Sequence, residues 1–215
     1  MAFFRRDFDT SLGEWELCLA SAIAAQDDMM QCVAYNLLGI WHQEKHDYPA
    51  ALDYHSRSKA LAEKLNEPVR VAKTLNNLGR LYLSQEDYQQ AEVLFQESLE
   101  IASRHRYMQD ESLAAGNLGY AKILQQDYDG ALPYLTRKLA LAEKMNDKLE
   151  TIKALGNMAT VYLETGRATQ SLQLYERIVR IKEYMGDADG AEKSRSIMES
   201  IRARMSESSS PQKTD

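Results

Sequence analysis

A four-residue pattern built on Asn and Gly recurs along this chain at intervals of forty residues. The copies read Asn-Leu-Leu-Gly from Asn36, Asn-Asn-Leu-Gly from Asn76, Gly-Asn-Leu-Gly from Gly116 and Gly-Asn-Met-Ala from Gly156. Self-similarity at a fixed period of about 20 to 50 residues is typical of a solenoid. Each repeat of such an array has an apolar face that only its neighbour can bury, so the whole chain is expected to stack in series. A protein built as such an array is expected to function through a binding surface.

The composition favours a helical protein of the cytoplasm. Gly and Pro are scarce, at 10 and 4 of 215 residues, and strong helix formers dominate. The formal net charge of -6 argues against nucleic acid as a partner, because its phosphates attract basic proteins. Cys18 and Cys32 are too few for a disulfide framework and are expected as reduced thiols. No apolar run is long enough for a signal peptide or a membrane span, so we expect a cytoplasmic protein with no membrane partner.

Each repeat is predicted to be a pair of helices, A and B. Three aspartates, Asp47, Asp87 and Asp127, are placed to cap the N-terminus of helix B, where a carboxylate accepts hydrogen bonds from free backbone N–H groups. The A helices are expected to begin near Met30, Val69, Gln109 and Leu149. Helix B carries a small residue where two helices approach closely, at Ala51, Ala91, Ala131 and Ser171. An apolar stripe continues at helical spacing through Leu61, Ile101, Leu141 and Ile181.

The two ends of the chain depart from the repeat. Residues 1–28 are predicted to be a half repeat consisting of helix B alone, with Phe3, Phe4, Phe8 and Trp15 on its apolar face. Full repeats are expected at 29–67, 68–107, 108–147 and 148–187. Residues 188–205 are expected to form a polar capping helix, and 206–215 a disordered tail.

These residues resemble the tetratricopeptide repeat, in the long form found in kinesin light chains and spindle-orientation adaptors. The match rests on Asn-Leu-Gly in helix A, on Tyr82 and Tyr162 one turn later, and on Asp-Tyr-x-x-Ala opening helix B. It covers roughly residues 7 to 204. The resemblance implies an all-α, right-handed superhelical solenoid of antiparallel helix pairs, about ten helices in all, whose A helices line a concave groove. Pro133, inside a helix B, departs from the pattern and is expected near the first turn, where it causes a mild bend.

The resemblance also implies which side chains face the groove. They are an Asn ladder with its neighbours one turn either side: Lys73, Asn77 and Arg80; Leu113, Asn117 and Tyr120; Lys153, Asn157 and Thr160. The spacing agrees, because residues at i, i+4 and i+7 share one face of a helix. A carboxamide both donates and accepts, so the ladder suits a peptide backbone. The alternative is that each Asn only bonds the neighbouring helix and holds the repeat spacing.

Hydrogen bonds from the ladder alone are too weak for useful affinity. Three bonds at about 1 kcal/mol each supply about 3 kcal/mol, whereas a micromolar ligand needs about 8 kcal/mol. Apolar pockets or charges must therefore contribute. Lys73, Arg80 and Lys153 place positive charge on the same face, which predicts a ligand with at least one carboxylate; the alternative is that these are ordinary solvated charges.

No pattern in the chain favours an enzyme or a cofactor. His42 and His46 have a spacing that can bind zinc, but no third ligand is evident, and His42 aligns with Tyr82 in a packing position. No nucleophile–base set, phosphate loop or dinucleotide motif is present. We therefore expect an adaptor or scaffold that binds a peptide or helical segment of another protein. The alternatives are a structural protein that self-assembles through its apolar N-terminal end, or a peptide-sensing regulatory domain of a larger signalling protein.

Overall fold

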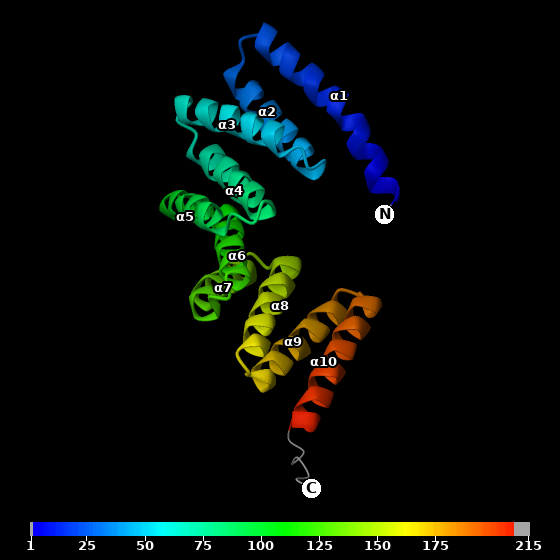
Figure 1. Ribbon diagram of the computed structural model, residues 1–215. Coiled ribbons are helices and arrows are strands. Elements are labelled where there is room, and N and C mark those ends of the chain that lie inside the picture. Colours follow the sequence, from blue (N-terminus) through cyan, green and yellow to red (C-terminus); the bar gives the residue numbers. More distant parts are fainter. Residues whose placement is uncertain (1, 209–215) are drawn as a thin grey trace. The chain divides into compact units, whose positions relative to one another are not determined.

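The computed structural model describes residues 2–208, with side chains described from Leu12 to Ser206. This part of the chain folds into ten α-helices and no strand, so the all-α prediction is confirmed (Figure 1). The helices are α1 (Ala2–Ala24), α2 (Asp28–Glu44), α3 (Tyr48–Lys64), α4 (Pro68–Ser84), α5 (Tyr88–Arg104), α6 (Met108–Leu124), α7 (Tyr128–Lys144), α8 (Lys148–Glu164), α9 (Ala168–Tyr184) and α10 (Ala188–Ser208). None of these helices is both long and apolar enough to cross a bilayer.

The forty-residue period has a simple structural origin. Each helix from α2 to α9 has 17 residues, and three residues separate it from the next helix. One helix and one connection therefore make a unit of twenty residues, and an A/B pair makes forty. The sequence repeat thus reflects a constant helix length and a constant connection.

The connections share one backbone conformation, illustrated by residues 45–47. The N–H of His46 donates to Gln43 O at 3.0 Å and the N–H of Asp47 to His42 O at 2.9 Å, which is the Schellman motif. The middle residue of each described connection has a positive φ: Gln26, His46, Asn66, Glu86, Arg106, Gln126, Asn146, Gly166 and Gly186. Glycine adopts this conformation at least cost, yet most of the connections use another residue.

In most connections the last residue is an aspartate, and that residue also caps the helix that follows. Asp47, Asp87 and Asp127 accept hydrogen bonds from backbone N–H groups three residues on, as predicted. Asp27 and Asp147 cap α2 and α8 in the same way. In these connections one aspartate ends one helix and starts the next. Glu67 and Arg167 stand at the same place before α4 and α9 without a side-chain cap, and their connections have the same length.

Close approach within the first three A/B helix pairs depends on the Gly of the repeated pattern, which the fourth pair replaces with Ala159. A Cβ added to Gly39 would lie 2.7 Å from the ring of His55, and one added to Gly79 would lie 2.5 Å from Phe95. The corresponding atom on Gly119 would lie 2.7 Å from Leu135. The small helix-B residues Ala51, Ala91, Ala131 and Ser171 are all fully buried, as predicted. In these three pairs the backbone of helix A at the Gly therefore lies directly against a side chain of helix B.

The chain divides into two compact units, Met1–Asn117 and Leu118–Asp215, with the division inside α6. In the first unit α1 packs on α2, α2 on α3, α3 on α4 and α4 on α5. In the second unit α7 packs on α8, α8 on α9 and α9 on α10. Sequential helices are thus neighbours within each unit. The right-handed superhelix stays a prediction.

Three local predictions concern the ends of the chain and Pro133. Helix α1, Ala2–Ala24, lies within the predicted half repeat 1–28, and the side chains of Phe3, Phe4 and Phe8 lie outside the described part of the chain. Helix α10 continues to Ser208, so the predicted tail begins no earlier than residue 209, where the described residues end. Pro133 is the sixth residue of α7, two residues past its first turn, and the helix continues to Lys144 without the break that a proline can cause, as expected.

Candidate functional site

The nine predicted groove residues are divided between the two units. Lys73, Asn77, Arg80, Leu113 and Asn117 belong to the first unit, and Tyr120, Lys153, Asn157 and Thr160 to the second. The three Asn side chains are half-buried and the other six residues are exposed. The first unit therefore holds the longest run of these positions, on α4 and α6.

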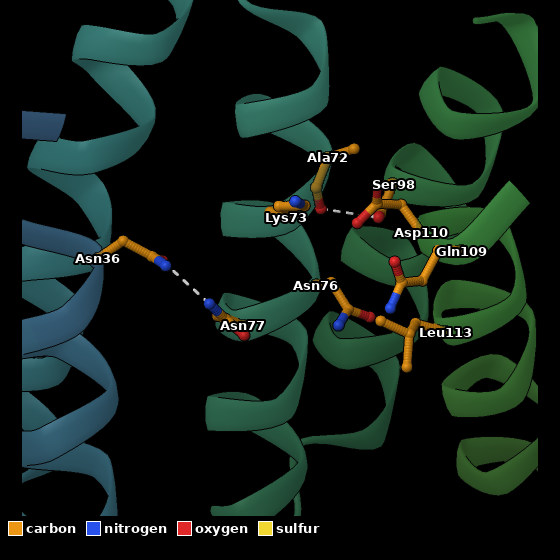
Figure 2. Close-up of a pocket in the computed structure, with 9 residues that line it drawn as sticks. All are labelled: Asn36, Ala72, Lys73, Asn76, Asn77, Ser98, Gln109, Asp110 and Leu113. Carbon is orange, nitrogen blue, oxygen red and sulfur yellow. Dashed lines mark hydrogen bonds between the residues drawn. The ribbon is translucent and has the colours of Figure 1, made fainter. Parts of the chain in front are cut away.

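Two members of the Asn ladder make hydrogen bonds between successive A helices. Asn77 Nδ2 on α4 donates to Asn36 Oδ1 on α2 at 2.9 Å (Figure 2). Asn117 Nδ2 on α6 donates to Asn76 Oδ1 on α4 at 2.8 Å. We call these two pairs the Asn rungs. Each rung ties one A helix to the A helix of the preceding repeat and fixes the orientation of both carboxamides.

The acceptors Asn36 and Asn76 were missed by the sequence reasoning. Each lies 41 residues before its donor, and the two lie 40 residues apart. Their own forty-residue spacing was the sequence signal that could have identified them. The same spacing continues with Gly116, which has no side chain to accept a bond. Asn157, half-buried on α8, therefore has no Asn at the position from which Asn36 and Asn76 act.

A cavity of about 220 Å³ opens beside the Asn rungs in the first unit. We call it the α4/α6 cavity. It is lined by Asn36, Ala72, Lys73, Asn76, Asn77, Ser98, Gln109, Asp110 and Leu113. Figure 2 shows Gln109 and Asp110 reaching from α6 toward α4. Three predicted residues, Lys73, Asn77 and Leu113, thus meet at one site.

The α4/α6 cavity contains one half-buried carboxylate. Burial raises the pKa of Asp110, an effect that the positive charge of Lys73 partly offsets. No ion pair or hydrogen bond to the side chain of Asp110 occurs within the described residues. At the base of the cavity Ser98 Oγ donates to Ala72 O at 2.8 Å. The lining is therefore polar, with one weakly compensated negative charge.

The predicted cation Lys153 already has a partner. Its Nζ donates to Glu150 Oε1 at 2.6 Å, and Glu150 also accepts from the buried Lys138. Burial alone would raise the pKa of Glu150, but the two lysines outweigh it and hold that pKa below its usual range. Lys153 is therefore a weaker candidate for an acidic ligand than Arg80, which is exposed and has no ion pair among the described side chains.

The other predicted positions in the second unit are simpler. Tyr120 is 42% exposed and supplies an aromatic surface at the start of this unit. Thr160 Oγ1 donates to Gly156 O at 3.2 Å, within its own helix. Its hydroxyl hydrogen is thus engaged in a local bond.

The two histidines with zinc-like spacing point to different neighbours. His42 Nδ1 lies 2.9 Å from Asp47 Oδ2, and its ring stacks on Tyr54 with centroids 5.1 Å apart. His46 Nδ1 lies 3.1 Å from the hydroxyl of Tyr48. Within the described side chains no group of three or more His, Cys, Asp or Glu is arranged to hold a metal ion.

Comparison with known proteins identifies the family. A family model described as tetratricopeptide repeat (TPR) matches residues 29–104 and 110–183. The chain belongs to the TPR family. No curated protein sequence matches it at a comparable significance.

Several solved structures share the fold at low sequence identity. BtubC (BKLC) from P. vanneervenii has a TM-score of 0.71 and 14% identity, over 97% of this chain and 95% of that one. A kinesin light chain of Podospora anserina with nearly identical TPR-like repeats has a TM-score of 0.61 and 14% identity, over 82% and 97%. A Rap protein in complex with competence and sporulation factor has a TM-score of 0.67 and 15% identity, over 93% and 60%. This chain thus spans about 60% of the length of that Rap protein.

Proposed function

We propose that this TPR protein is a non-enzymatic, cytoplasmic adaptor that binds an extended or helical segment of a partner protein at the α4/α6 cavity. The observation that carries the proposal is the cavity itself, which lies beside the two Asn rungs on successive A helices of one compact unit. The Rap protein in complex with competence and sporulation factor supports a binding role for an array of this fold.

The cavity offers polar groups that suit a peptide backbone. Asn76 and Gln109 carry carboxamides, which both donate and accept, and the Asn76–Asn117 bond orients one of them. Preorganised groups lose less conformational freedom on binding, which favours affinity. Leu113, 37% exposed at the edge of the cavity, adds apolar area for a neighbouring side chain.

Arg80 is our candidate for an acidic group of the partner. It lies one turn beyond Asn77 on α4 and is exposed. A guanidinium binds a carboxylate through two parallel hydrogen bonds, which gives both orientation and specificity. The acidic group would therefore sit beside the cavity, near the Asn36–Asn77 rung.

Peptide display against the purified chain tests the proposal. Peptides selected from a random library are expected to bind the chain in solution, and the double variant Gln109→Ala/Leu113→Ala is expected to weaken that binding while leaving the melting temperature unchanged, because both side chains are exposed. Glu97→Gln is the control, because Glu97 is exposed on α5 and is not among the residues that line the cavity. Failure to select any binding peptide, or equal binding by the double variant, would contradict the proposal.

Self-assembly is a second candidate, favoured by exposed apolar side chains on α1. Leu17 is 68% exposed and Ile23 50% exposed on this helix. If copies associate here, light scattering will give a mass above the 24.5 kDa of one chain, and Leu17→Glu will lower it. A wild-type mass of one chain at micromolar concentration would sink this candidate.

A further inference from the structure

One helix-B position changes from serine to lysine along the array. Ser58 and Ser98 occupy it in the first unit, and each donates to a helix-A carbonyl, Cys32 O at 2.9 Å and Ala72 O at 2.8 Å. Forty residues after Ser98 the position holds Lys138, which is only 5% exposed. A lysine is seldom buried unless its charge is paired, so the surroundings of Lys138 show what this position can accommodate.

The partner of Lys138 aligns with the carboxylate of the α4/α6 cavity. Lys138 Nζ donates to Glu150 on α8, which also accepts from Lys153. Glu150 lies forty residues after Asp110, at the same place in helix A. In the second unit, this carboxylate therefore holds two ammonium groups, one of them buried.

The α4/α6 cavity contains the carboxylate without the buried ammonium. Asp110 has the charge of Lys73 nearby, beyond ion-pair distance, and Ser98 stands where the later repeat has its lysine. The cavity that Ser98 lines has a volume of about 220 Å³, well above the roughly 10–15 Å³ that a single water molecule needs.

The preceding repeat provides a contrast. There a smaller cavity, of about 80 Å³, is lined by Ser58 and by Arg70, which aligns with Asp110 and Glu150. A cation at the serine position would meet a guanidinium instead of a carboxylate. The α4/α6 cavity therefore differs from its neighbour in both volume and charge.

We propose that the α4/α6 cavity receives the ammonium group of a lysine side chain from the partner segment, in the place that Lys138 takes in the next repeat. The inference rests on the proposed function and names the ligand chemistry. The ammonium has three N–H donors. Asp110 would accept one, and the oxygens of Ser98 and Gln109, both on the cavity wall, are available for the others.

Charge favours this occupant over an anionic one. A carboxylate in the cavity would lie beside Asp110 with the single charge of Lys73 to offset two negative groups. With an ammonium bound, Asp110 would have two cations near it, Lys73 and the bound group, as Glu150 has Lys138 and Lys153. Like charges at close range in a half-buried site are unfavourable. An acidic group of the same partner would instead pair with Arg80, outside the cavity.

A lysine built into the chain tests the cavity without any ligand. Ser98→Lys is expected to fold with a melting temperature within a few degrees of the wild type and to lower the pKa of Asp110, measured by NMR. Ser58→Lys is the matched control, since its new ammonium meets Arg70, and we expect it to lose about 5 °C or more. Ser98→Lys/Asp110→Asn should lose as much as the control. An equal loss in Ser98→Lys and Ser58→Lys would overturn the inference.

A random peptide display library tests the ligand. Peptides selected on the wild-type chain are expected to be enriched in lysine relative to the unselected library, and replacing the critical lysine by norleucine should weaken binding about tenfold or more. Selection on Asp110→Asn should lose the enrichment while still yielding binders, and selection on Glu97→Gln should retain it.

The outcomes separate this inference from the proposed function. Binders without lysine enrichment, or binders enriched in acidic residues, would overturn the lysine assignment and leave the peptide-binding role standing. Lysine enrichment that persists on Asp110→Asn would also overturn it. Absence of any binder would remove both proposals together.

Discussion

The ring of His55 lies against the patterned Gly39, at a repeat position where the next two repeats have apolar side chains. It aligns with Phe95 and Leu135, and all three are fully buried. Neither ring nitrogen of His55 has a hydrogen-bond partner within the described residues. Burial, with a smaller effect from Arg80, lowers the pKa of His55 to about 4. An imidazole in this place thus costs stability that an apolar ring would not cost.

Stability should fall as the pH drops from about 6.5 to about 4. In this range the unfolded chain binds a proton at His55 that the folded chain does not, so lowering the pH favours unfolding, by an amount of order 3 kcal/mol over the whole range. His55→Phe should remove this part of the pH dependence and raise the free energy of unfolding at pH 7 by about 1–3 kcal/mol. Urea denaturation across the range measures both effects.

The control for this prediction is a histidine in an exposed position. His105→Gln changes a residue on the surface and leaves His55 in place, so the pH dependence should persist. An unchanged slope in His55→Phe would show that other groups cause the loss of stability in acid.

At the scale of the element, sequence reasoning succeeded where one local cause determines the structure. Asp47, Asp87 and Asp127 were predicted as caps because a short acidic side chain just before a helix accepts hydrogen bonds from the free backbone N–H groups of its first turn. The positive φ values of Glu86 and Arg106 were not predictable from residue type, because the Schellman backbone, rather than a glycine, imposes them. The need to join two 17-residue helices with three residues outweighs the low preference of these residue types for a positive φ.

Glu86→Gly should therefore stabilise the chain. Glu86 is exposed with φ 62°, a conformation that glycine adopts without the steric cost that a Cβ brings. We expect a gain of about 0.5–1 kcal/mol in the free energy of unfolding, since the added freedom of glycine in the unfolded chain offsets part of the relief. The reverse change, Gly166→Ala at φ 72°, should cost about 1 kcal/mol. Thermal denaturation of the two variants checks the opposite signs.

At the scale of the whole molecule, the sequence predicted a repeating array but only part of its site. Lys73, Asn77 and Leu113 were predicted and meet at the α4/α6 cavity. Asp110 was missed because one carboxylate near a helix start reads as a solvated charge, and its burial depends on neighbouring helices. Lys138 was missed for the same reason, since pattern reasoning does not place a lysine inside an array. Burial is a property of the stack and does not appear in any single repeat.

The Asn rungs should couple one repeat to the next. The stability of a repeat array is approximately a sum of repeat terms and nearest-neighbour interface terms, and the Asn76–Asn117 bond belongs to an interface. Asn117→Ala removes the donor and leaves the half-buried Asn76 carboxamide without it, so we expect a loss of about 1–3 kcal/mol in the free energy of unfolding.

A double-mutant cycle shows whether that loss belongs to the rung. Asn76→Ala, Asn117→Ala and the double variant should give a coupling energy of about 1 kcal/mol in urea denaturation, because the second substitution no longer breaks a bond. The cycle Asn36→Ala with Asn117→Ala is the control, since these residues belong to different rungs and their effects should add. Additive effects in the Asn76–Asn117 cycle would mean that the two carboxamides act independently, as groove groups rather than as a tie between neighbouring repeats.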